Sequence, residues 1–484
     1  MAYKLLSLLS LSSLVLASTP ATSRHSSHHR RSTPGSKHVI IQMFQWNWES
    51  IAAECAWIGA NGYGYVQVSP PNESVKFSPS HWYDDYQAVS YKLTSKHGTQ
   101  AQFAAMVSTC KSHGVGVLVD LLWNDMAGVD SGVGTAGTTF THYSYPGTYT
   151  GSDFHNCGTD GDQIVDWNNA YQIQNCQLAN LADLNTASEK VRATLAAYAN
   201  TLVGMGVAGF RVDASKHIPT ADLSNIMSRV HNKDALYWTH EVVDEGGPIR
   251  ASSYTGLATY NDVQEFKFAT MICQAFTGGV ALSSFQNIAS LGWLPSNKAN
   301  TFVINHDRER SGCSSGILNA ASADNAYKLA SVFALGLGYG TPTVFSGFSF
   351  SASNTAQDAP NGGYGSCAGG SGWHCEHRYT EIVGMVGFYK QTGSAAVSKW
   401  VNGGSGQVAF ARTGQGFVII NFNPAAWKNT FTTGLPDGTY CDVTKGAKLG
   451  KTCTGAKVTI SGGKISNYSV TARTAVAIHI GAKL

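Results

Sequence analysis

Eight short apolar segments recur along the first three quarters of the chain, and this repeat constrains the fold more than any other feature. They occupy residues 38–44, 63–69, 115–122, 208–213, 235–241, 263–268, 301–307 and 341–347. Each is a nearly continuous run of β-branched and aromatic residues, which is typical of parallel strands buried on both faces. Helical stretches such as 101–114 and 188–206 lie between several of them. Eight strand–helix repeats predict an α/β fold, a closed (β/α)8 TIM barrel.

Two departures from the repeat divide the chain further. About 60 residues rich in Gly, Thr, Tyr and Asp follow the third strand, and a structureless loop of that length is uncommon in a compact domain. We therefore expect 124–186 to be a small inserted subdomain between a first barrel part at 37–123 and a second at 187–394. Over 395–484, short alternating strands are separated by Gly-containing turns, which predicts an antiparallel C-terminal β-sandwich.

The N-terminus has the pattern of a segment that directs secretion. Lys4, an apolar run over 5–15 and small residues at 17–18 predict a signal peptide at 1–17 and an extracellular protein. A membrane anchor is the alternative, but a span needs about 20 apolar residues and serines interrupt this run. Residues 18–36 are rich in Ser, His, Pro and Arg, so we expect a disordered leader or pro-segment there. No later stretch is apolar enough to predict a membrane span.

Charge and cysteine content narrow the class of protein. Charged residues make up 13% of the chain, the net charge is +3 and no block of like charges occurs, so nothing points to a nucleic-acid partner. Ten cysteines without a CxxC spacing favour disulfides over zinc in a secreted chain. Three pairs flank short loops: Cys157–Cys176, Cys367–Cys375 and Cys441–Cys453. Cys55 and Cys110 lie in successive helical stretches and form a fourth candidate pair. The remaining two, Cys273 and Cys313, pair with each other if they pair at all.

Polar residues stand at the carboxyl ends of four predicted strands, where the side chains of a TIM barrel converge on one mouth. They are Asp120 on the third strand with Asn124 and Asp125 after it, Arg211 and Asp213 on the fourth, Glu241 on the fifth, and His306 and Asp307 on the seventh. Crowded carboxylates push their pKa values apart, as glycoside hydrolysis requires of its nucleophile and its acid. A single Asp after a strand is often a helix cap, but three such acids at three strand ends favour a catalytic cluster.

The segments GFRVDASKHIP, HEVVDEGG, FVINHD, QVSPPNE and VDLLWNDMAG resemble the signature regions of the α-amylase family of glycoside hydrolases, in its animal- and fungal-type branch. The resemblance covers roughly residues 38–484. It implies a monomeric enzyme that hydrolyses internal α-1,4 bonds of starch, glycogen and maltooligosaccharides with retained configuration. Asp213 would be the nucleophile, Glu241 the general acid/base and Asp307 the stabiliser of the transition state.

The same resemblance implies the residues that hold the sugar and a calcium ion. The sugar-contacting residues would be Trp82, Tyr83, Tyr86, Gln87, Asp125, Arg211, Lys216, His217 and His306. Calcium would bind the side chains of Asn124 and Asp183 and the backbone oxygens of Gln174 and His217. These four residues form no metal motif on their own, so the calcium expectation depends on the resemblance alone.

Two positions depart from the family pattern. Asp125 stands where the family has a His that contacts the sugar at the cleavage point, which leaves open a starch-binding relative with impaired catalysis. Ser349 stands where chloride-activated members carry an Arg, so chloride activation is not expected although Arg211 and Asn305 match the other chloride ligands. A glucan transferase of the same family is a further alternative. Glycosylation sequons occur at Asn72 and Asn467, of which Asn467 is the better candidate.

Overall fold

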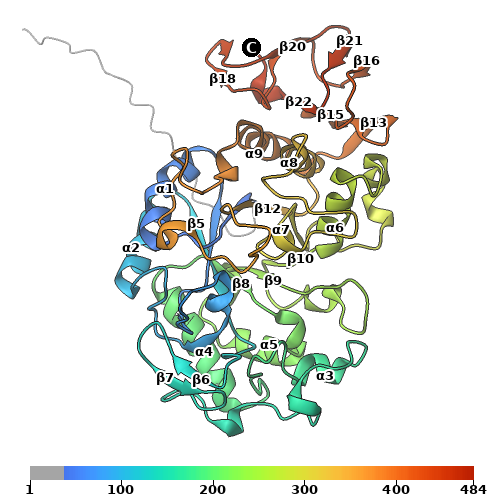
Figure 1. Ribbon diagram of the computed structural model, residues 1–484. Helices are drawn as coiled ribbons and strands as arrows, with labels where there is room; N and C mark the ends of the chain where they lie inside the picture. The colour runs from blue at the N-terminus through green and yellow to red at the C-terminus, as the bar shows by residue number, and fades with distance from the viewer. Residues whose placement is uncertain (1–37) are drawn as a thin grey trace, which may run out of the picture.

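The computed structural model describes residues 38–484, and its central feature is a closed barrel of eight parallel strands (Figure 1). The strands follow one another around the barrel in chain order, and every neighbouring pair is parallel. They are β1 (Ile40–Met43), β2 (Tyr65–Val68), β5 (Gly116–Leu121), β8 (Gly209–Val212), β9 (Tyr237–His240), β10 (Asn261–Gln264), β11 (Ala299–Phe302) and β12 (Thr341–Ser346). The predicted TIM barrel is thus confirmed. The predicted signal peptide (1–17) and leader (18–36) lie outside the described residues.

Helices connect the strands and cover the barrel. They are α1 (Trp48–Ala60), α2 (Gln100–Ser112), α4 (Glu189–Gly204), α5 (Thr220–Ser228), α6 (Phe266–Phe276), the single turn α7 (Arg308–Ser311), α8 (Ala326–Leu337) and α9 (Thr380–Thr392). Their starts are encoded locally, because a Thr99–Gln102 capping box opens α2 and the Asn47 side chain accepts from Ser50 N at the start of α1. After β9, only a 3₁₀ turn (Ala251–Tyr254) precedes the next strand.

Two predicted strands are misplaced along the chain. The sixth was expected at 263–268, but β10 ends at Gln264 and the sequence FKF begins α6. The Glu265 side chain caps that helix by accepting from Lys267 N. The seventh was expected at 301–307, but β11 ends at Phe302 and the motif continues as a loop. A short apolar run does not distinguish a buried strand from the first turn of a buried helix, which explains the error at 263–268. At 301–307 the apolar run extends past the end of the strand into a loop.

The segment 124–186 lies at the end of the molecule opposite the C-terminal sheets (Figure 1). It contains the hairpin β6 (Ser131–Val133) and β7 (Thr139–Thr141) and the short helix α3 (Ala170–Asn175). It packs against the barrel loop that carries β3 (Glu73–Ser74) and β4 (Ala88–Ser90), where the buried Glu73 carboxylate accepts from the backbone N–H groups of Ala136 and Thr138. A buried charge stabilised by backbone donors therefore fixes the hairpin to the barrel.

The C-terminal part is antiparallel throughout, as predicted. A four-stranded sheet contains β13 (Val397–Gly404), β14 (Gln407–Arg412), β15 (Gly416–Asn421) and β22 (Thr474–His479), in that order. The second layer of the C-terminal part contains two strand pairs, β16 (Trp427–Thr432) with β21 (Lys464–Val470), and β17 (Gly438–Cys441) with β20 (Lys457–Ile460). A further small pair consists of β18 (Lys448–Leu449) and β19 (Thr452–Cys453). Side chains of both layers, such as Ile419 and Phe431, form a separate hydrophobic core. The opposite face of the sheet packs on α8 and α9 through Phe410 and Val418.

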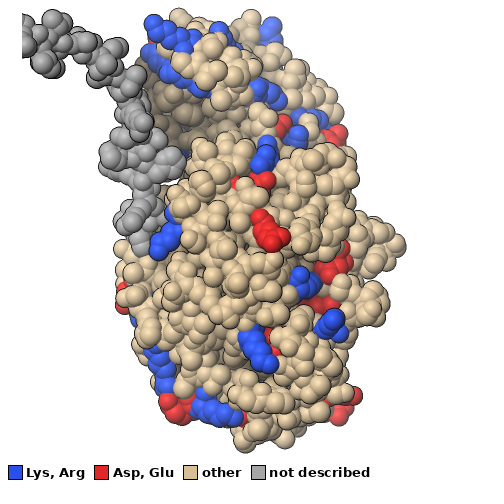
Figure 2. All heavy atoms as spheres, turned by 90° about the vertical axis from the view of Figure 1, so that its left-hand side faces the viewer, with Lys and Arg blue, Asp and Glu red and all other residues tan. Residues whose placement is uncertain are grey.

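All ten cysteines form disulfides in the structure. The pairs are Cys55–Cys110, Cys157–Cys176, Cys273–Cys313, Cys367–Cys375 and Cys441–Cys453. The face shown in Figure 2 carries Lys and Arg side chains scattered among Asp and Glu, separated by wide uncharged areas. None of the helices within 38–484 combines the length and the apolar character that crossing a membrane requires.

Candidate active site

Arg211 is the centre of the cluster at the barrel mouth. It lies on β8, is fully buried and bonds three carboxylates with the two ends of one guanidinium group. Its Nη1 lies 2.6 Å from Asp120 Oδ1 and 2.5 Å from Asp213 Oδ1. Its Nη2 lies 2.7 Å from Glu241 Oε1. Because Asp213 and Glu241 share one planar cation, their carboxylates are held side by side at the ends of adjacent strands.

The cluster extends to the motif after β11 through Tyr86. The Tyr86 hydroxyl donates to Asp120 Oδ2 at 2.9 Å, and its ring stacks on His306 with centroids 5.1 Å apart. His306 Nε2 lies 3.5 Å from Asp307 Oδ2, and His306 Nδ1 lies 3.0 Å from the amide nitrogen of Gln42 on β1. Burial lowers the pKa of His306 well below its usual range, so the ring is neutral at pH 7.

Burial and the neighbouring charges together raise the pKa values of Asp120 and Asp213. Burial raises the pKa of Asp120 to about 6, although Arg211 beside it lowers the pKa. Burial raises the pKa of Asp213 well above its usual range; the charges of Glu241 and Asp120 also raise it, and Arg211 opposes them. Burial and neighbouring carboxylates thus favour the protonated forms of both acids, and Arg211 favours their ionised forms.

An aromatic surface borders the cluster on one side. Trp82 and Tyr86 belong to a 3₁₀ helix (Trp82–Tyr86), and the Trp82 ring lies edge-on to His306 with centroids 5.6 Å apart. Tyr83 is 38% exposed and stacks on His81 at 4.9 Å. Arg310 lies over the Trp82 ring, and both side chains donate to the Thr355 carbonyl oxygen. The loop after β12 therefore holds the predicted stacking surface in place.

A cleft of about 670 Å³ opens on the other side of Glu241. It is lined by Lys216 and His217, which the resemblance implies contact the sugar, and by Trp167 from the inserted segment. Lys216 Nζ donates to the Val243 carbonyl oxygen at 2.9 Å and lies 5.7 Å from the centre of the Trp167 ring. Trp167 is 49% exposed, so much of its ring remains available to a ligand.

The four predicted calcium ligands lie in two pairs: Asn124 with Asp183, and Gln174 with His217. Asn124 lies three residues after the end of β5, and its carbonyl oxygen accepts from the N–H of Leu184, the neighbour of Asp183, at 2.9 Å. His217 Nδ1 lies 2.8 Å from the carbonyl oxygen of Ile173, the neighbour of Gln174 on α3. Gln87, predicted to contact sugar, accepts from Gly128 N with its side-chain oxygen and so helps to hold the inserted segment.

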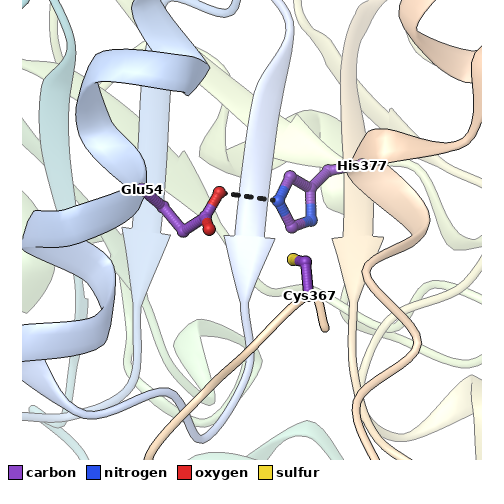
Figure 3. A group of neighbouring side chains, drawn as sticks. All are labelled: Glu54, Cys367 and His377. Carbon is purple, nitrogen blue, oxygen red and sulfur yellow. Dashed lines mark ion pairs between the residues drawn. The ribbon is translucent and has the colours of Figure 1, made fainter. Parts of the chain in front are cut away.

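Another group of potential metal ligands lies away from the mouth. Glu54, Cys367 and His377 offer three ligand atoms within 4.8 Å of one another (Figure 3). Cys367 is in a disulfide with Cys375, so its sulfur cannot act as a thiolate ligand. Glu54 also pairs with Arg378, at 2.7 Å. These contacts make the group a structural ion-pair cluster.

Comparison with known proteins identifies the family. Residues 62–363 match the model of the α-amylase catalytic domain, and residues 400–481 match that of the α-amylase C-terminal all-β domain. The chain belongs to the α-amylase family. An α-amylase of Thermomonospora curvata is 40% identical to it over 496 residues, which cover 98% of this chain and 77% of that protein.

Solved structures agree with this assignment. A mutant of α-amylase I from Eisenia fetida, solved in complex with maltohexaose, matches with a TM-score of 0.85 and 34% identity, covering 92% of this chain and 98% of that chain. CldA, a cyclomaltodextrin glucanotransferase, shares the fold at a TM-score of 0.71 with 17% identity, covering 92% of this chain and 99% of that chain. The first likeness supports an α-amylase-type enzyme, whereas the second shows the fold alone.

Three contributors to this α-amylase-type site escaped sequence reasoning. Trp167 is a lone aromatic residue in a polar stretch, and Gln42 is a polar residue inside an apolar strand. Arg310 follows Asp307 by three residues, and this spacing places it one helical turn away in α7. The spacing of Arg310 from Asp307 was the only feature of the three from which the sequence could have predicted a place near the barrel mouth. The residues that flank Trp167 and Gln42 in the sequence do not indicate that either side chain reaches it.

Proposed function

We propose that this chain is a secreted, endo-acting α-amylase that cleaves internal α-1,4 bonds of starch, glycogen and maltooligosaccharides with retained configuration. The observation that carries the proposal is the shared cation, because Arg211 holds the Asp213 and Glu241 carboxylates on the two ends of one guanidinium. A retaining mechanism needs two carboxyl groups about 5–5.5 Å apart, and residues bound to one guanidinium are held at such short range. Five disulfides support export to an oxidising compartment.

In the proposed mechanism Glu241 donates its proton to the glycosidic oxygen as the bond to the anomeric carbon breaks. Asp213 attacks that carbon and forms a covalent glycosyl-enzyme, while Asp307 stabilises the positive charge of the transition state. Glu241 then removes a proton from water, which attacks the anomeric carbon and releases Asp213. The sugar would stack on Trp82 and Tyr83 on one side and extend past Lys216 and His217 on the other.

The test is product analysis on a long maltooligosaccharide. We expect a spread of shorter chains whose new reducing ends are first α-anomers, as seen by proton NMR before mutarotation. Products longer than the substrate would indicate a glucan transferase instead. Starch retention without new reducing ends would indicate a starch-binding protein with impaired catalysis, and the departure from the family pattern at Asp125 would then explain the loss.

Replacing Asp120 should change how the rate of the reaction depends on pH. Asp213 must be ionised to attack, so kcat/KM is lost as the pH falls through its raised pKa. Asp120→Asn removes a negative charge that contributes to this rise, so the pKa of Asp213 falls. We expect the acid limb of the kcat/KM profile to move down by roughly one pH unit. Asp442→Asn, a buried control in the C-terminal sheets, should leave the limb in place; an upward shift in Asp120→Asn would contradict the assignment.

Trp167 should bind the part of a long substrate beyond Glu241. We expect Trp167→Ala to raise KM for maltohexaose about tenfold, as loss of about 1.4 kcal/mol of ring contact would do, with little change in kcat. Tyr171→Ala is the matched control, because Tyr171 is also an exposed aromatic residue of the inserted segment and does not line the cleft. Equal KM values in the two variants would show that Trp167 does not contact the substrate.

We also propose a calcium ion held by the side chains of Asn124 and Asp183 and the backbone oxygens of Gln174 and His217. The donor chemistry fits, because these are hard oxygen ligands and Asp183 is a buried carboxylate with no Lys or Arg partner in 38–484. When bound, the ion would supply a positive charge that cross-links the inserted segment to the barrel. We do not propose chloride activation, because Ser349 supplies a hydroxyl near His374 where an Arg would be needed.

The asparagines of the two glycosylation sequons differ in their exposure to solvent. Asn72 is fully buried, its amide nitrogen donates to the Glu73 carbonyl oxygen and its amide oxygen accepts from the Tyr198 hydroxyl. Asn467 is exposed on β21. We therefore propose Asn467 as the glycosylated residue, on a monomeric protein without nucleic-acid or membrane partners.

A further inference from the structure

Asp125 lies directly opposite Asp183 in a short antiparallel bridge. Leu184 N donates to the Asn124 carbonyl oxygen at 2.9 Å, and Met126 N donates to the Ala182 carbonyl oxygen at 3.0 Å. The bonds therefore flank the two aspartates instead of joining them. In such a pair the side chains project from the same face of the bridge, with Cβ atoms roughly 4.5–5.5 Å apart. The backbone thus places the two carboxylates together.

Both carboxylates are withdrawn from water, with exposed fractions of 6% for Asp125 and 2% for Asp183. Within residues 38–484, the one ion pair on either of them is that of His155 Nδ1 with Asp183 Oδ2, at 2.6 Å. Buried like charges directly opposite each other are destabilising unless a cation offsets them. The pairing of Asp125 with Asp183 is therefore unfavourable without a nearby cation, and no Lys or Arg within 38–484 forms an ion pair with either residue.

Asn124 completes the arrangement. Its amide nitrogen donates to Asp125 Oδ1 at 2.7 Å, which directs Asp125 toward the amide group of a proposed calcium ligand. The amide oxygen of Asn124 is then left to act as a ligand. Three oxygen-bearing side chains thus meet where the two ends of the inserted segment pair with each other beyond β5, and hard oxygen donors of this kind suit Ca²⁺.

We propose that Asp125 is a ligand of the same calcium ion as Asp183, and not a residue that contacts the sugar. This inference depends on the calcium site proposed above, and it gives that site two carboxylates where the family pattern, with His at this position, has one. Ligand charge is a main determinant of calcium affinity, so this chain should bind Ca²⁺ more tightly than it would with a His there. The sugar at the cleavage point would then lack a contact from this position.

The experiment is isothermal titration of the chelator-treated full chain with CaCl2. We expect Asp125→Asn, which keeps the shape and removes the charge, to raise Kd at least about tenfold. The rise in Tm on adding Ca²⁺ should shrink in parallel. Asp442→Asn is the control for removing a buried aspartate elsewhere, and its Kd should match that of the unaltered chain.

A second variant keeps the test decisive if Asp125→Asn does not fold. Asp125→His introduces the residue of the family pattern, and we expect it to bind Ca²⁺ with the same weakened affinity. Unchanged Kd in either folded variant, with a raised KM for maltohexaose, would overturn the proposal and return Asp125 to the sugar. No calcium binding by the unaltered chain would also overturn it, while the hydrolysis assay would still judge the proposed activity separately.

Discussion

Asp213→Asn is expected to abolish turnover of soluble starch, lowering kcat by about 10⁴-fold or more, as removal of a catalytic nucleophile or its partner does. The amide is a poor nucleophile at the anomeric carbon, so the covalent intermediate does not form. Asn keeps the size of the side chain beside Arg211, so the fold should persist. A reducing-sugar assay measures the loss, and circular dichroism checks the fold.

A second variant separates the nucleophile from the acid. Glu241→Gln should also fail on starch, yet it should still cleave an α-maltosyl fluoride at a measurable rate, because fluoride leaves without being protonated. Asp213→Asn should be inactive on both substrates, since each needs the nucleophile. If Asp213→Asn cleaved starch at a rate close to that of the unaltered enzyme, the assignment of the nucleophile would be wrong.

Arg211→Met should damage both stability and activity. The guanidinium is fully buried and offsets Asp120, Asp213 and Glu241 at once. Removing it leaves three crowded carboxylates without their cation, and breaking a buried ion pair in this way costs about 3–5 kcal/mol. The remaining acids would take up protons at neutral pH, so Asp213 would no longer be ionised and turnover should fall with stability.

Urea unfolding at pH 7 measures this cost, with Arg229→Met as the control. Arg229 pairs with Glu189 through two hydrogen bonds on the surface, so its loss should cost less than about 1 kcal/mol. Stability of Arg211→Met within 1 kcal/mol of the unaltered chain, together with normal turnover, would show that the cluster does not depend on this cation. Titration of stability between pH 5 and 8 adds a check, because the variant should lose stability as the pH rises and the acids ionise.

Much of the barrel was predictable because its signals are local. Continuous apolar runs at regular intervals identify buried parallel strands, and the closed barrel is what eight of them form. The errors at 263–268 and 301–307 arose where an apolar run crosses from strand to helix or loop, a boundary that Glu265 sets by capping α6. The acids 213, 241 and 307 could be placed at one mouth because each follows a strand whose direction the fold determines.

The sequence by itself determined that this is a barrel with acids at the ends of three of its strands, because strand periodicity and short motifs are properties of neighbouring residues. The tertiary structure alone decided that Asp213 and Glu241 share Arg211, that Lys216 lies over the Trp167 ring and that Asp125 faces Asp183. The physical reason is distance along the chain. The Arg211–Glu241, Trp167–Lys216 and Asp125–Asp183 contacts join residues about 30 to 60 positions apart. Barrel closure and the folding of the inserted segment bring these residues together, not any pattern in the local sequence.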